Sequence, residues 1–196
     1  MNYPQNETET HFLLKEIAKY ILWWWGYTKI ATEVHNMYAF DISGQLRAKK
    51  KGMKNTIDTV GIKRCSKFIP HEGYRYWHDI RGIEAKASLS DFKNGFCAAP
   101  ALTYIIAPIG VIPVELIPEK IGLIEVDFNK FSLKKDSNKV SEIKGVRFTL
   151  RAKRRLDSRF KDKEMYQKWC TEMLETVAYR CSQELLFWRN AIEFTT

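Results

Sequence analysis

One stretch of sequence limits the possible folds more than any other: Arg81-Gly-Ile-Glu84-Ala-Lys86-Ala-Ser-Leu-Ser-Asp91-Phe92. Side chains two residues apart share one face of a strand, so Glu84 and Lys86 point together and the apolar residues around them point to the opposite face. A carboxylate and an ammonium group at the end of an apolar strand cost desolvation free energy, which is tolerated when the pair serves a functional site. The pattern predicts a strand that ends in a functional pair.

Other strands and helices are expected on both sides of this stretch. Strands are predicted, from Val, Ile, Thr and aromatic content, at residues 27–34 with an extension at 37–42, 56–62, 76–87, 101–107 and 121–126. Helices are predicted at residues 11–25 and 162–191, where apolar side chains recur at three- and four-residue steps, and Ser88 is expected to cap a short helix from Leu89. Residues 63–75 are predicted to be a basic loop and residues 129–145 a hairpin or loop.

This order of elements predicts one α/β layered domain over residues 1–196, with a mixed central sheet of about five strands flanked by helices. Residues 1–10 are expected to be a loose polar start, residues 45–77 a basic, loop-rich insertion, and residues 162–191 a C-terminal helix. The 196 residues are enough for one core, and a hydrophobic content of 45% excludes disorder for most of the chain.

Composition also limits the cellular setting. No stretch approaches the ~20 nearly uncharged residues of a membrane span, and the N-terminus lacks the basic region of a secretory signal, so a cytoplasmic protein is the expectation. The four cysteines are far apart and form no CxxC pair, which disfavours a disulfide framework. A zinc site built from Cys65, His71, His78 and Cys97 would match no common finger spacing.

The net charge of +9 is concentrated in two segments. Residues 45–77 have a balance of +7 and residues 147–163 a balance of +6, which leaves −4 for the rest of the chain. Such a distribution indicates a surface for a polyanion rather than a uniformly basic composition.

A second acidic residue is needed beside Glu84 for a hard metal ion, because such ions take oxygen ligands. Asp58 is the first choice, since a hairpin between its strand and the next would bring it near Glu84. Asp41 is the alternative, although it precedes a Ser-Gly turn and fits a turn role as well. Glu33 is a further candidate ligand, because its strand should neighbour that of Asp58.

An Asp on one strand followed by Glu-x-Lys on the next resembles the PD-(D/E)xK nuclease superfamily. The longer context is similar to the MmcB-like DNA-repair group: Ile83-Glu-Ala-Lys-Ala-Ser-Leu-Ser-Asp-Phe, then Tyr104-Ile-Ile-Ala-Pro, then Ile112-Pro-Val-Glu-Leu-Ile-Pro-Glu-Lys-Ile-Gly-Leu-Ile. The similarity covers about residues 11–190. It departs at Ile57, where the motif has Pro, and in a longer, more basic segment between Glu33 and Asp58.

The resemblance implies a restriction-endonuclease-like core, Mg²⁺ or Mn²⁺ as cofactor, and cleavage of DNA phosphodiester bonds, in repair, recombination or phage DNA processing. It assigns catalytic roles to Asp58, Glu84, Lys86 and Glu33, with Asp41 as the alternative. The implied metal ligands are Asp58, Glu84 and Ala85, the last of which has only its backbone oxygen to offer.

The basic segments supply the expected DNA contacts, in the manner of a groove that follows the phosphate backbone. The candidates are Arg47, Lys49, Lys50, Lys51, Lys54, Lys63, Arg64, Lys67, Arg151, Arg154 and Arg155. Tyr74, Tyr76 and Trp77 lie around Arg75 and suit either stacking on unpaired bases or ordinary packing.

Two other functions fit the same sequence. One is a non-cleaving nucleic-acid-binding module of the same fold, and the other is a phage-type regulatory protein that binds an acidic partner. The expected partner is DNA, whether single-stranded, duplex or branched; no membrane association is expected, and a homodimer is left open.

Overall fold

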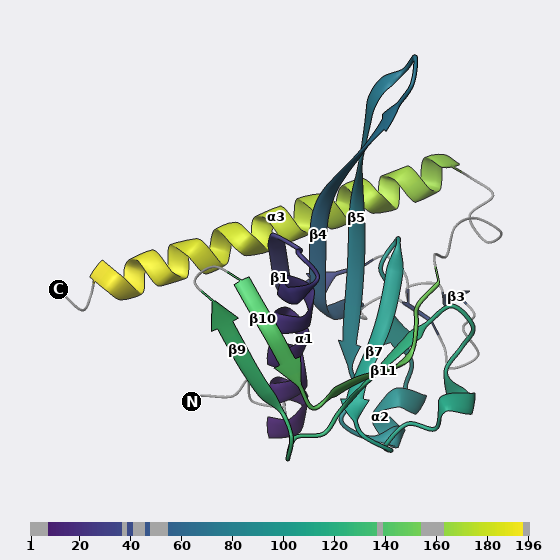
Figure 1. Ribbon diagram of the computed structural model, residues 1–196, viewed down its shortest axis with the longest axis vertical. Coiled ribbons are helices and arrows are strands. Elements are labelled where there is room, and N and C mark those ends of the chain that lie inside the picture. Colours follow the sequence, from purple (N-terminus) through teal and green to yellow (C-terminus); the bar gives the residue numbers. More distant parts are fainter. Residues whose placement is uncertain are drawn as a thin grey trace.

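A computed structural model of the chain describes residues 8–36, 39–40, 46–47, 55–136, 139–153 and 163–193. Its centre is a mixed sheet with the strand order β1-β4-β5-β7-β8-β11 (Figure 1). Its strands are β1 (Lys29–His35), β4 (Thr56–Ile69), β5 (Gly73–Ala85), β7 (Leu102–Pro108), β8 (Gly122–Val126) and β11 (Val146–Leu150). The pairs β5–β7 and β7–β8 are parallel, and the other neighbours are antiparallel.

The remaining elements flank this sheet. The helices are α1 (Glu9–Trp24), α2 (Leu89–Lys93), α3 (Lys163–Glu193) and the 3₁₀ helix η1 (Val114–Leu116). Two small sheets are formed by β9 (Ser132–Asp136) with β10 (Lys139–Lys144), and by β2 (Ala39–Phe40) with β3 (Leu46–Arg47) and β6 (Phe96–Cys97). The predicted α/β architecture with a mixed central sheet is confirmed. The sheet has six strands rather than about five, because β11 lies in a segment for which no strand was predicted.

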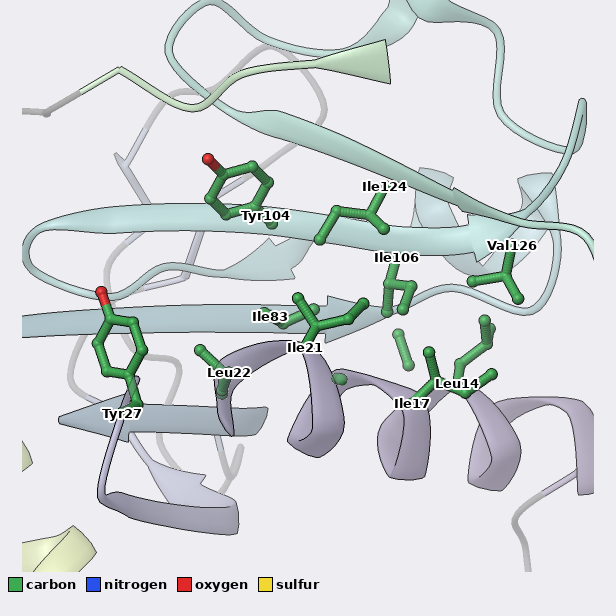
Figure 2. Close-up of a cluster of buried hydrophobic side chains, with 12 residues drawn as sticks. Leu14, Ile17, Ile21, Leu22, Tyr27, Ile83, Tyr104, Ile106, Ile124 and Val126 are labelled. Atoms are coloured by element: carbon green, nitrogen blue, oxygen red, sulfur yellow. The ribbon is translucent and has the colours of Figure 1, made fainter. Parts of the chain in front are cut away.

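Helix α1 covers one face of the sheet. Thr8 caps it by accepting a hydrogen bond from the His11 N–H at 3.3 Å. Leu14, Ile17 and Ile21 are buried against the strands, where they pack on residues of β5, β7 and β8 (Figure 2). The predicted helix at 11–25 is therefore confirmed, and its apolar stripe forms one half of the core.

Helix α3 packs on the opposite face, over β1, β4 and β5. Trp169, Met173 and Val177 are all buried, as the predicted helical stripe requires. The Trp169 Nε1–H donates to Asn36 Oδ1 at 2.7 Å, and Asn36 Nδ2 donates to the Ala98 carbonyl at 2.8 Å. These bonds tie the helix to the end of β1, because a buried indole N–H and a buried amide both need partners.

The prediction of a basic loop at 63–75 is wrong. The ladder between β4 and β5 continues from Thr59 opposite Ile83 outward to Ile69 opposite Gly73, so these residues form a long hairpin. Its outer end projects away from the rest of the fold (Figure 1). Charge density suggested a loop, whereas β-branched and aromatic residues between the cations favour strands. The turn is made by residues 70–72, where His71 has a φ of +74°.

The hairpin of β9 and β10 confirms the first of the two alternatives for residues 129–145. It packs against α1 through Val140 and Ile143. None of the helices in the described ranges is long and apolar enough to cross a membrane.

Candidate active site

The candidate site forms where β4 and β5 separate. Their backbone ladder ends at the pair Thr59–Ile83, so the Ala85 N–H has no ladder partner on β4. That N–H instead donates to Asp58 Oδ2 at 2.8 Å. On the other edge β5 is still joined to β7, through a bond from the Lys86 N–H to the Ile106 carbonyl at 2.9 Å. The Asp58 carboxylate therefore occupies the split between two central strands.

Glu84 lies beside Asp58, and both are buried, with exposed fractions of 3% and 9%. The Cys97 N–H donates to Glu84 Oε1 at 2.5 Å. A hydrogen bond joins the two carboxyl groups, which requires a proton shared between them. The predicted proximity of Asp58 and Glu84 is confirmed, and the hairpin between their strands is its cause.

The shared proton belongs mainly to Glu84. Burial, the negative charge of Asp58 and the hydrogen bond to it raise the pKa of Glu84 well above its usual range. Burial also opposes ionisation of Asp58, but hydrogen bonds from His11, Glu84 and the Ala85 N–H outweigh it and hold the pKa of Asp58 at about 2. The pKa values of the two neighbouring carboxyl groups are thus shifted in opposite directions, as in other carboxyl pairs that share a proton.

Lys86 follows directly and is 8% exposed. Its Nζ lies 3.5 Å from Asp91 Oδ1, at the start of α2. Burial would lower the pKa of Lys86, but the surrounding acidic groups Glu84, Asp91 and Asp58 raise it above its usual value. Lys86 is therefore a buried cation held among acidic groups. Ser88 caps α2 by accepting from the Asp91 N–H at 3.1 Å, which confirms its predicted role.

Helix α1 brings two basic side chains to the same end of the sheet. His11 Nε2 lies 3.5 Å from Asp58 Oδ2. Lys15, one turn later on the same helical face, forms an ion pair with Glu33 on β1 and is 7% exposed. Glu33 does lie on the strand beside that of Asp58, as predicted, and its partner is Lys15.

The backbone is distorted at this point. Glu33 has a φ of +53°, in the left-handed region that costs a non-glycine residue about 1–3 kcal/mol. Ala31 and Val34, which regular alternation would place on opposite faces, belong to the same buried cluster. Ile57 and Val60 on β4 do the same. In both strands the regular alternation of side chains between the two faces is therefore interrupted at Glu33 and Asp58. Irregularities of this kind change the direction of side chains and are common next to functional sites.

The predicted DNA-contacting cations fall into two groups. Lys63, Arg64 and Lys67 lie on the outer half of the β4–β5 hairpin, and Arg151 follows β11; all four are exposed. For Arg47 only the backbone, in β3, is described. The other cation candidates, Lys49, Lys50, Lys51, Lys54, Arg154 and Arg155, lie outside the described residues, as does Asp41, the alternative catalytic residue.

The donor set suits a hard divalent cation. Asp58 and Glu84 offer carboxylate oxygens, and the Ala85 carbonyl points to the same strand edge as its N–H, which is the edge occupied by Asp58. A cation in place of the shared proton would neutralise both carboxylates. Within the described ranges, no group of three or more His, Cys, Asp or Glu side chains is arranged to hold a metal ion, and this holds for Cys65, His71, His78 and Cys97 as well.

His11 and Lys15 were missed from the sequence as members of this site. The available signal was weak: a lysine adjacent to the apolar stripe of a helix, with a histidine four residues before it. Comparison with protein-family models, with curated proteins and with solved structures gives no match for this chain.

Proposed function

We propose that the protein is a metal-dependent nuclease that hydrolyses DNA phosphodiester bonds, with a restriction-endonuclease-like core and a PD-(D/E)xK site. One observation carries the proposal: Asp58 and Glu84 are buried in contact at the split between two central strands, with the buried cation Lys86 two residues further. Such an arrangement costs desolvation free energy, which a purely structural role would not repay.

Asp58, Glu84 and the Ala85 carbonyl would hold Mg²⁺ or Mn²⁺, because these are hard oxygen ligands. When bound, the ion supplies Lewis-acid activation of the phosphoryl oxygen and lowers the pKa of a coordinated water.

Lys86 has the position and charge to orient the attacking water and to offset negative charge in the transition state. Asp91 at the N-terminus of α2 keeps that ammonium group ionised and positioned. His11 donates to Asp58 and so favours its ionised form before any cation arrives. Glu33, through its pair with Lys15, places a second cation from α1 at the same end of the sheet.

The test compares wild type with Glu84→Gln and Asp58→Asn on single-stranded, duplex and branched DNA, with Mg²⁺, Mn²⁺ or EDTA. Both substitutions keep the size of the side chain and one acceptor oxygen while removing the ionisable group, and folding is checked by circular dichroism. Glu142→Gln, on the exposed β9–β10 hairpin, is the matched control. We expect cleavage by wild type and the control only with a divalent ion, and a loss of at least ~100-fold in the two site variants.

Absence of cleavage by wild type on every substrate would overturn the proposal. If wild type then still binds DNA, the non-cleaving module of the same fold takes its place; if it binds only an acidic protein, the regulatory function does. Cleavage that survives in folded Glu84→Gln would leave a nuclease but overturn this site.

A further inference from the structure

The outer arm of the hairpin, residues 63–78, differs from the rest of the described sheet in having four exposed aromatic side chains, of which Trp77 is the least exposed at 37%. Phe68, Tyr74 and Tyr76 have exposed fractions of 58%, 64% and 56%. A contiguous group of exposed aromatic side chains of this kind marks an interaction surface, whereas single exposed rings such as Tyr179 are ordinary.

These rings belong to one face of the arm. Residues directly opposite in an antiparallel pair share a face, and Phe68 stands opposite Tyr74, while Arg64 stands opposite His78. Phe68 and Tyr74 contact edge-on at 5.3 Å between centroids, and Tyr74 and Tyr76 are stacked at 6.2 Å. The guanidinium of Arg64 lies 4.5 Å from the centre of the Tyr76 ring. The aromatic face is thus a continuous row of three rings ending in a cation.

The other face of the arm is basic. Lys67 stands opposite Arg75, and both line a pocket of about 630 Å³ together with Trp77 and residues of α3. Over residues 63–78 the chain has four Lys or Arg and one Asp or Glu. Rings with Arg64 on one face and the cations Lys67 and Arg75 on the other supply the two components of a surface for single-stranded nucleic acid, namely stacking and phosphate attraction.

We propose that the outer arm binds unpaired nucleotides of the substrate, with bases stacked on Phe68, Tyr74 and Tyr76. The inference rests on the proposed function and names its substrate class: DNA that contains a single-stranded segment. Bases in a duplex stack on one another and offer no free ring face, so this surface discriminates against fully paired DNA. A second copy of this chain is a poor occupant, because two positively charged arms would repel.

The arm continues the two strands that carry Asp58 and Glu84, so it is rigidly connected to the candidate active site. Eight residues separate Glu84 from Tyr76 along β5, which at ~3.3 Å per residue is about 26 Å. Changes to the rings should therefore leave the carboxylate pair intact, and binding can be measured apart from cleavage.

The experiment measures binding by fluorescence anisotropy, in EDTA and in a Glu84→Gln background, so that no cleavage occurs. One probe is labelled oligothymidine of about 20 nucleotides, which is longer than the ~4–16 nucleotides covered by one OB-fold, a common single-strand-binding domain. The other probe is a blunt duplex of the same length. The variants are Tyr74→Ala with Tyr76→Ala, and Tyr74→Phe with Tyr76→Phe. Tyr179→Ala is the control, because this α3 tyrosine has an exposed fraction of 63%.

The double alanine variant should bind oligothymidine at least ~10-fold more weakly, since each stacked base contributes that order of affinity. Duplex binding should change less than about twofold, and the slope of log K against log salt should stay the same, because no phosphate contact is removed. The phenylalanine pair should retain binding within about twofold, and the control should match wild type.

Equal loss on both probes, no loss on oligothymidine, or no binding of either probe by the parent protein would each overturn the inference. So would a wild-type dimer in sedimentation that the alanine substitutions dissociate, because the rings would then pack on a second copy. If wild type cleaves DNA but the double alanine variant binds oligothymidine like the parent protein, the nuclease proposal stands and the arm proposal is overturned. If binding depends on the rings but wild type does not cleave DNA, the arm proposal stands and the nuclease proposal is overturned.

Discussion

The inner and outer halves of the β4–β5 hairpin share one continuous ladder and have opposite properties. On β4, residues 57–62 are buried, whereas residues 63, 64 and 66–68 are exposed. The inner half is flanked by β1 and β7 and covered on its two faces by α1 and α3. The outer half extends beyond the flanking strands β1 and β7 (Figure 1). Strand pairing alone therefore does not decide whether a residue is buried or exposed; the neighbouring strands and helices decide it.

The border between the two halves is marked by a polar cluster. The Tyr27 hydroxyl donates to Asp79 Oδ2 at 2.6 Å, and Arg81 Nη2 lies 3.5 Å from the same oxygen. Arg81 also stacks over the Trp25 ring at 4.5 Å from its centre. Burial and the bond to Asp79 raise the pKa of Tyr27 far above its usual value, so this phenol stays protonated and donates at any physiological pH.

The largest expected effect lies in the inner half. Lys86→Met removes the buried cation while keeping the length of the side chain, and we expect DNA cleavage to fall by about 100–1,000-fold, because charge stabilisation in the transition state is lost. Lys93→Met, an exposed lysine on α2, is the control and should cleave like wild type. Initial rates on a labelled substrate measure both, and a rate within threefold of wild type for Lys86→Met would contradict its proposed role.

Tyr27→Phe should disrupt the polar cluster at the border between the two halves and lower the stability of the fold. Asp79 would lose a part-buried donor, at a cost of ~1–3 kcal/mol in the free energy of unfolding. For a chain of this length each kcal/mol lowers Tm by about 2–4 °C. Thermal unfolding followed by circular dichroism measures the change, with exposed Tyr179→Phe as the control; equal Tm values would show that the border contributes nothing.

Glu84→Gln should raise stability in EDTA while it abolishes cleavage. The pKa of Glu84 is raised in the folded protein, so the unfolded chain releases this proton at lower pH and the carboxyl group destabilises the fold as pH rises above about 4. Glutamine is always neutral and keeps the bond from the Cys97 N–H. We expect a gain in Tm near zero at pH 4 that grows to about 2–4 °C at pH 7, measured by unfolding across pH. A gain that is the same at all pH values would refute this account of the pair.

The smallest effect is expected in the outer arm. Phe68→Ser changes a largely exposed ring and should alter the free energy of unfolding by no more than ~0.5 kcal/mol. Urea titration measures it. A larger loss would show that the arm contributes to the core and would weaken the contrast between the two halves.

Much of the fold followed from local patterns. The stripe Trp169, Met173 and Val177 predicted the face of α3, and Ser88 predicted the start of α2, because side-chain periodicity and capping act over a few residues. The same reasoning failed at residues 63–75, where the cations outweighed the few strand-forming side chains between them. No strand was predicted at β11 either, although charge indicates exposure and does not exclude a ladder.

The sequence by itself predicted that a hairpin would bring Asp58 near Glu84, with Asp41 as the alternative, and that Lys86 shares the face of Glu84, because hairpins and strand alternation are local features. Only the tertiary structure decided which carboxyl group keeps the proton, because burial, the Asp58 charge and the His11 contact all depend on how α1 and β4 pack around β5. It also decided that the basic segment after Asp58 is an arm with its rings facing outward, because exposure depends on where the neighbouring layers end. Periodicity is encoded locally, whereas desolvation is a property of the whole assembly of layers.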